Sequence, residues 1–342
     1  MIRARRRRTG RGPDAGTRRR LRCSFVLILL SAIIPLVFSG CASQREIVRQ
    51  EAASDKLQIV TTNFPPYDFA RQITGSRADV RMLLKPGEEP HSFEPSPQDI
   101  RLIQNADLFV CAGGENDEWV NEILDSMQGS RPETLRMTDC ASTVTEERTA
   151  GMTLRSKEKE DSSAEQETDE HVWTSPENAI KIVRKMTEII CKKDKKNAGY
   201  YKKRSLAYQK KLRSLDRELK ETVRGSRRKT IVFGDRFPFR YLTDELGLKY
   251  RAAFPGCAAD SEPSAATIVY LTKIVRREKI PIVFTMELST GKTADTICEI
   301  TGARKETLNS CHNLTARQFK NGATYLSLMR RNARLLKEAL NE

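Results

Sequence analysis

The chain has 342 residues and a formal net charge of +15, from 60 lysines and arginines against 45 aspartates and glutamates. Ten of the arginines lie in residues 3–22, so the chain after residue 41 keeps 50 basic and 44 acidic residues, a net charge of +6. These charges are interspersed, as in KKDKKNAGYYKKRS, which is typical of solvated helix faces and argues against a nucleic-acid-binding surface. About 300 residues exceed the usual size of one domain and predict two.

Residues 1–41 have the pattern of a secretory signal, with a basic region followed by the apolar stretch LRCSFVLILLSAIIPLVFSGC. Because Cys41 directly follows Ser39-Gly40, the pattern indicates a bacterial lipoprotein signal, with Cys41 lipidated and anchored to the outer face of the cell membrane. Phe38 stands where such a signal usually has leucine. The alternative is a transmembrane anchor, but the apolar run is shorter than the roughly 20 residues that a span needs. We expect residues 42–55 to be a linker.

Residues 56–175 alternate apolar runs with helical patterns, which predicts a first α/β lobe with a parallel sheet. In the second helix, Ser96 is suited to the N-cap and Pro97 to the first helical position. Residues 143–170 are charged and poor in apolar side chains, and they predict a mobile surface loop. The predicted strands are 57–63, 79–85, 106–114 and 134–139, and the predicted helices are 65–75, 96–106 and 117–128.

Residues 176–226 are strongly helical, with a break at residues 194–199. The second half is long enough to be a rigid connecting helix rather than a core helix. Residues 227–342 repeat the alternation and predict a second α/β lobe, in which Gly247 caps a helix. The predicted strands are 230–235, 249–256, 280–286 and 306–311, and the predicted helices are 239–248, 264–279, 293–303 and 322–341.

The chain has three histidines, His91, His171 and His312, one in each successive third of the sequence, and each follows a segment that ends a predicted strand. Ligands of open α/β sheets bind beyond the carboxyl ends of the strands, and two such lobes predict a cleft between them. Imidazole is a common zinc ligand, and three histidines with one carboxylate complete a four-coordinate shell. A scattered surface histidine is the alternative for any one of them alone.

Six cysteines follow residue 41. In an exported protein some of them are expected to pair, and Cys257 with Cys311 is a candidate bridge within the second lobe. The cysteine count leaves the connectivity open. A zinc cluster of cysteine and histidine is the alternative, but no CxxC spacing supports it.

The segments PGEEPHSFEPSPQDI and DEHVWTSPENA resemble the first two ligand segments of the metal-binding lipoproteins of bacterial zinc and manganese ABC importers. The resemblance covers nearly all of the chain after the signal. It implies that His91 and His171 are ligands, with Glu170 in place of the proline that usually precedes the second ligand. It also implies two parallel-sheet α/β lobes joined by a long rigid helix, with the metal site in the cleft between the lobes.

The second half departs from this family pattern. The third ligand of the family is a His or Glu just after the first strand of the second lobe, where this chain reads VFGDRFPFRYLTDELGL. Asp235 is the nearest carboxylate but needs a one-residue shift, without which the match is Arg236, and a pair between these two residues is the alternative. The fourth ligand, usually Asp, corresponds to His312. Glu287 is a second candidate carboxylate, either as a ligand or as a hydrogen-bond partner of a ligating imidazole.

The resemblance therefore implies a metal site of His91, His171, Asp235 and His312, and a monomer that captures Zn²⁺ outside the membrane and delivers it to an ABC permease with its ATPase. The nitrogen-rich set favours zinc, and a manganese or iron carrier of the same family is the alternative. A secreted zinc hydrolase is a further alternative, but the HExxH and GxSxG motifs are absent, so we expect no enzyme. A lipid-anchored surface adhesin has no support in the sequence.

Overall fold

The computed structural model describes residues 56–114, 117–127, 129, 131–152, 168–256 and 263–342. The predicted signal, the predicted lipidation site Cys41, the predicted linker and most of the predicted charged loop lie outside these ranges. Within them, no helix is both long enough and apolar enough to cross a membrane. Residues 56–342 form one compact unit.

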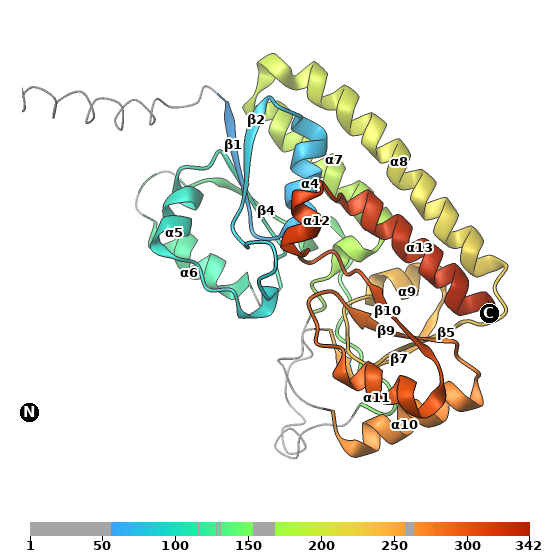
Figure 1. The fold of residues 1–342 in the computed structure, drawn as a ribbon. Coiled ribbons are helices and arrows are strands. Elements are labelled where there is room, and N and C mark those ends of the chain that lie inside the picture. The colour runs from blue at the N-terminus through green and yellow to red at the C-terminus, as the bar shows by residue number, and fades with distance from the viewer. Residues whose placement is uncertain (1–55, 115–116, 128, 130, 153–167, 257–262) are drawn as a thin grey trace, which may run out of the picture. The chain divides into compact units, whose positions relative to one another are not determined.

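The first sheet has four parallel strands in the order β2-β1-β3-β4 (Figure 1). Its strand residues alternate between two apolar clusters. Ile59 and Val110 pack with helix α4, whereas Val60 and Phe109 pack with helices α5 and α6 on the opposite face. Both faces are covered, as expected for a parallel sheet. The elements are β1 Leu57–Thr61, α4 Phe64–Thr74, β2 Ala78–Met82, α5 Pro97–Gln104, β3 Leu108–Cys111, α6 Glu118–Ser126 and β4 Glu133–Arg136.

The second sheet is also parallel, in the order β10-β9-β5-β7. The same alternation recurs, because Val232 and Val283 pack with helices α10 and α11 while Phe233 and Phe284 belong to the large cluster on the other face. A short two-stranded sheet of β6 and β8 lies beside it. The elements are β5 Thr230–Phe233, β6 Arg236–Phe237, α9 Arg240–Leu246, β7 Lys249–Arg251, β8 Phe254–Pro255, α10 Ala265–Arg277, β9 Ile282–Met286, α11 Lys292–Thr301 and β10 Arg304–Leu308.

Two helices, α7 (Pro176–Lys193) and α8 (Ala198–Arg224), connect the first sheet to the second along the chain. The 3₁₀ turn Lys195–Asn197 separates them at the predicted break. Figure 1 shows α8 lying along α13 (Tyr325–Asn341). Unlike a bare connector, α8 buries a continuous stripe in the large apolar cluster, and this stripe includes Tyr208, Leu212 and Leu215.

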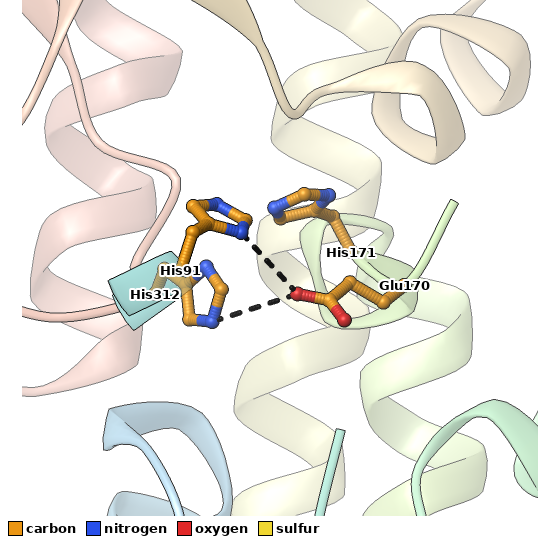
Figure 2. Close-up of side chains that lie close together, drawn as sticks. All are labelled: His91, Glu170, His171 and His312. Atoms are coloured by element: carbon orange, nitrogen blue, oxygen red, sulfur yellow. Dashed lines mark ion pairs between the residues drawn. The ribbon is translucent and has the colours of Figure 1, made fainter. Parts of the chain in front are cut away.

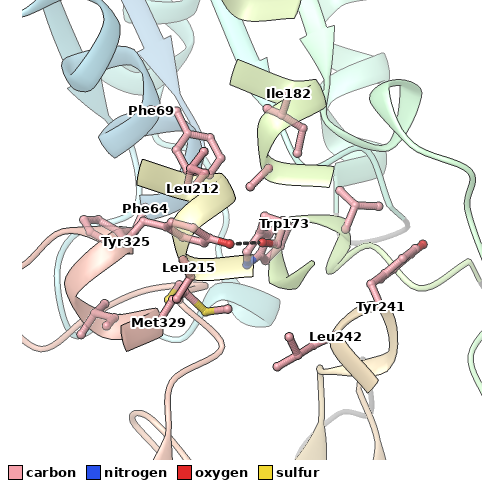
Figure 3. Packing of buried hydrophobic residues seen from close by; sticks show 14 of the residues in the cluster. Phe64, Phe69, Trp173, Ile182, Leu212, Leu215, Tyr241, Leu242, Tyr325 and Met329 are labelled. Carbon is pink, nitrogen blue, oxygen red and sulfur yellow. Dashed lines mark hydrogen bonds between the residues drawn. The ribbon is translucent and has the colours of Figure 1, made fainter. Parts of the chain in front are cut away.

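The large apolar cluster continues from the first lobe into the second (Figure 3). Phe69 meets Tyr325 edge to face with ring centroids 5.0 Å apart, and the Tyr325 hydroxyl donates to the backbone oxygen of Trp173 at 2.6 Å. Leu242 of α9 belongs to the same cluster. This shared core fixes the backbone around residue 173, which lies beside one of the three histidines.

The structure confirms the predicted fold class of two parallel-sheet α/β lobes with a long helix between them. The sequence missed β6 and the short helix α12 (Ala316–Lys320), and it set the last strand, β10, too late in the chain. The proposed Cys257–Cys311 bridge was wrong, because the structure has Cys311 as a free, fully buried thiol enclosed by the core; Cys257 lies outside the described residues.

Candidate metal centre

His91 lies on the connection that follows β2, within the one-turn 3₁₀ helix Pro90–Ser92. The backbone of this connection is partly exposed, but the His91 side chain points inward and is only 7% exposed. A proline at the start of the turn restricts the local backbone and suits the first position of a helix. The imidazole is therefore buried although it comes from a loop.

His171 lies just before α7 and is held by the residue two positions earlier. The Asp169 carboxylate accepts a hydrogen bond from the His171 backbone N–H at 2.8 Å and lies 3.0 Å from the ring Nδ1. Nδ1 therefore carries the proton, and the lone pair is on Nε2, which has no hydrogen-bond partner within the described part of the chain. A carboxylate behind an imidazole is the usual support of a metal-ligating histidine.

His312 lies on the loop between β10 and α12, and Glu287 organises this loop. The Glu287 carboxylate accepts from the backbone N–H and hydroxyl of Ser310, at 2.7 and 2.6 Å, and from the His312 N–H at 3.2 Å. Cys311 adopts a φ of 62°, which is uncommon for a residue with a side chain. The Trp173 ring packs edge to face on His312, with centroids 4.9 Å apart.

Figure 2 shows the three imidazoles converging with the carboxylate of Glu170. One potential ligand atom from each of these four residues lies within 4.8 Å of the others. Glu170 Oε1 is 3.9 Å from both His91 Nδ1 and His312 Nε2. Donors around a tetrahedral zinc are about 3.3–3.5 Å apart, given bonds of about 2.0–2.2 Å. A contraction of roughly half an ångström would bring these two 3.9 Å separations to the spacing of zinc donors.

Burial and neighbouring charges set the protonation of two of these imidazoles. Burial, together with the nearby His91, His171 and Arg236, holds the pKa of His312 well below its usual value, so its ring is neutral and offers a lone pair. Burial also disfavours the charged form of His171, but the adjacent Asp169 outweighs this effect and raises the pKa of His171. Of these two imidazoles, His171 is therefore the one on which a proton competes with metal binding.

The structure does not bring Asp235 into this cluster. Its carboxylate accepts hydrogen bonds from the Thr285 hydroxyl, the Met286 N–H and the Arg236 N–H. Glu287 is likewise engaged with the His312 loop, where it accepts from Ser310 and from the His312 backbone N–H. Among the described residues, the carboxylate that lies with the three histidines is Glu170. The sequence signal for Glu170 was its replacement of the proline that usually precedes the second ligand.

A small cavity of about 20 Å³ reaches the cluster from the first lobe. Glu170 and His312 line it together with residues of the first lobe that include Pro90, Phe93 and Trp119. This volume is sufficient for about one water molecule and far too small for a hydrated metal ion. A hydrated ion would pass through this cavity only if some of the lining moved.

Comparison with known proteins agrees with this geometry. The family model of ZnuA, described as zinc-uptake complex component A, periplasmic, matches residues 59–339. The chain belongs to the ZnuA family. This finding confirms the resemblance that the ligand segments indicated.

Individual relatives extend the match. The chain is 33% identical to the high-affinity zinc uptake system protein ZnuA of Bacillus subtilis over 92% of its length and 97% of the relative. It is 32% identical to the zinc-binding lipoprotein AdcA of Streptococcus pneumoniae over 93% of its length, but it spans only 61% of AdcA. The solved Zn(II)-bound ZnuA-like domain of that AdcA matches with a TM-score of 0.68 and 32% identity, covering 84% of this chain and all of the domain.

Proposed function

We propose that this chain is the extracytoplasmic substrate-binding component of an ABC importer, which captures Zn²⁺ and delivers it to a membrane permease. The observation that carries this proposal is the buried cluster of three imidazoles and one carboxylate between two α/β lobes. The names of the relatives, zinc-binding lipoprotein AdcA and zinc uptake protein ZnuA, support the same cargo. Their lipoprotein and periplasmic descriptions also support a location outside the cytoplasm, with Cys41 as the anchor.

The proposed ligands are His91, Glu170, His171 and His312, so Glu170 takes the place that the sequence assigned to Asp235. His171 binds through Nε2, because Asp169 occupies Nδ1. Three nitrogens and one oxygen suit zinc, whereas manganese prefers a shell dominated by oxygen. Four protein donors close a tetrahedral shell and leave no position for a catalytic water, which favours a carrier over a zinc hydrolase.

A competition titration against a chromophoric chelator, with Zn²⁺ and separately with Mn²⁺, tests the cargo. The full chain is expected to bind one Zn²⁺ tightly and Mn²⁺ far more weakly, following the affinity order of divalent metals at nitrogen-rich sites. Tighter binding of Mn²⁺ than of Zn²⁺, or binding of neither ion, would overturn the proposal.

The ligand assignment has its own test. Glu170→Gln keeps the size of the side chain but removes its charge, and we expect zinc affinity to fall roughly 100-fold, since an anionic donor is lost. Glu177→Gln, at an exposed carboxylate seven residues along the chain, is the matched control and should leave zinc affinity unchanged. Unchanged zinc affinity in Glu170→Gln would rule out Glu170 as the fourth ligand.

A further inference from the structure

The connection that carries His91 is held by side-chain contacts from the other lobe. A turn closes within it, where the Glu88 N–H donates to the Lys85 oxygen at 3.0 Å. Asn313, the neighbour of His312, donates from Nδ2 to the backbone oxygens of Lys85 and Glu88 at 2.9 and 2.8 Å. Asn313 directly follows His312, the proposed ligand in the second lobe. It therefore holds the segment that leads to His91, the proposed ligand in the first lobe.

A second tie reaches the same connection one residue later. Arg236 Nη2, from β6 of the second lobe, lies 3.2 Å from each carboxylate oxygen of Glu89. The Arg236 side chain is 7% exposed and that of Glu89 is 28% exposed. A charge-assisted contact of this kind is among the stronger hydrogen bonds, and little solvent screens a partly buried pair. Glu89 is two residues from His91, so the pair acts close to the ligand.

Asp235 fixes the backbone position of Arg236. Its carboxylate is bound to Thr285 and Met286 at the end of β9, and it also accepts from the Arg236 N–H at 2.9 Å. The backbone at Arg236 is thereby attached to the central part of the second sheet. The residue that the sequence suggested as a ligand instead anchors the arginine that reaches across to Glu89.

We propose that Arg236 is a positioning residue for zinc capture: its pair with Glu89 holds the His91 connection closed over the site, and breaking the pair opens the route by which zinc leaves. This inference rests on the proposed zinc-binding function. The small cavity at the site supports it, because Pro90 and Phe93 of the same connection line this cavity, which is too small for a hydrated ion as it stands. The lobes are thus tied together by protein contacts as well as by the metal.

The test measures zinc dissociation from the loaded full chain, by stopped flow into excess chelator, for Arg236→Met, Glu89→Gln and the double variant. Each single variant is expected to release zinc roughly 10- to 100-fold faster, the range typical of residues that support metal ligands. The double variant should be no faster than the faster single variant, because both changes break the same contact. Arg236→Lys, which keeps the charge, should recover part of the slow release.

Two further measurements separate positioning from a general structural role. The Co²⁺-loaded variants should keep the wild-type absorption spectrum, because the ligands themselves are unchanged. Arg304→Met, at an exposed ion pair with Glu338 and Glu342 in the second lobe, should leave the release rate unchanged. Wild-type release rates in folded Glu89→Gln, or effects that multiply in the double variant, would overturn the inference. Failure of the wild-type chain to bind zinc would instead overturn the proposed function.

Discussion

The histidine cluster of His91, Glu170, His171 and His312 can be compared with an acidic cluster of Glu177, Asp216 and Glu245, because in each the potential ligand atoms lie within 4.8 Å of one another. The acidic cluster joins α7, α8 and α9, and it already encloses a cation. Lys220 Nζ lies 2.8 Å from Asp216, 3.5 Å from Glu245 and 2.5 Å from Glu177. Its ammonium group occupies the place that a metal ion would need.

The histidine cluster differs in the state of its donors. His171 Nε2 and His312 Nδ1 have no hydrogen-bond partner in the described part of the chain, and both rings are buried. Buried polar atoms are usually satisfied, so these imidazole nitrogens call for an external partner. Asp216 Oδ1 and Glu245 Oε1 of the acidic cluster also lack a hydrogen-bond partner among the described residues, but the Lys220 ammonium lies 2.8 and 3.5 Å from them. Closely spaced ligand-type side chains are therefore weaker evidence for a metal site than nitrogen lone pairs that no protein group uses.

The largest expected effect comes from removing an unused lone pair. His171→Ala should weaken zinc binding by about a thousandfold, because the binding free energy of a four-ligand zinc site, about 10–16 kcal/mol, corresponds to several kcal/mol per ligand. A chelator-competition titration measures the change. Zinc affinity within tenfold of wild type would contradict the role of the histidine cluster.

The acidic cluster should instead affect stability. Burial, together with Asp216, raises the pKa of Glu245 to about 7. A carboxyl whose pKa is raised in the folded state lowers stability as pH rises from about 4.5 to 7, because the unfolded chain ionises first. Glu245→Gln removes this penalty and should stabilise the protein by up to about 3 kcal/mol at pH 8 and by almost nothing at pH 4.

Denaturant unfolding of wild type and Glu245→Gln at the two pH values measures this difference. Zinc affinity serves as the control, since the substitution lies outside the histidine cluster and should leave zinc affinity unchanged. An equal effect at pH 4 and pH 8 would show that the carboxyl has an ordinary pKa.

A smaller loss should follow from disturbing the support of a ligand. Asp169→Asn keeps the size of the side chain, but its amide no longer requires a proton on His171 Nδ1. We expect zinc affinity to fall 10- to 100-fold, the usual cost of losing such a support. The titration used for His171→Ala measures it, and a loss as large as that of His171→Ala would indicate collapse of the site rather than a supporting role.

The smallest expected effect concerns Lys220, whose ammonium group we expect to keep metal out of the acidic cluster. Lys220→Met removes the ammonium group and leaves three carboxylates together. Such sets bind Ca²⁺ weakly, so about 10 mM Ca²⁺ should stabilise the variant by about 1 kcal/mol while leaving wild type unchanged. Thermal unfolding with and without Ca²⁺ tests this. An identical response of the two proteins would show that the Lys220 ammonium is not what keeps metal out of the acidic cluster.

Local patterns in the sequence were sufficient to predict most of the fold. Alternating apolar runs located the main strands, and Ser96 caps α5 with the predicted capping geometry. Gly247 ends α9 in the left-handed conformation. These features depend on neighbouring residues, so they can be read from short segments. The packing of α8 was missed because its buried stripe is defined by partners far away in the chain.

The site was only partly predictable for the same reason. The three histidines stood out because histidine is rare in this chain. Glu170 and Asp235 could not be ranked from spacing, since each is a carboxylate close to a motif. What distinguishes them is the three-dimensional position of each carboxylate: Glu170 lies with the histidines, whereas Asp235 is bonded to Thr285, fifty positions along the chain.

A crystal structure of the zinc-loaded protein, with anomalous diffraction measured at the zinc absorption edge, tests the central claim most directly. We expect a single strong anomalous peak bonded to His91, Glu170, His171 and His312, with Lys220 still paired with the acidic cluster. A peak bonded to Asp235, or a shell without Glu170, would contradict it.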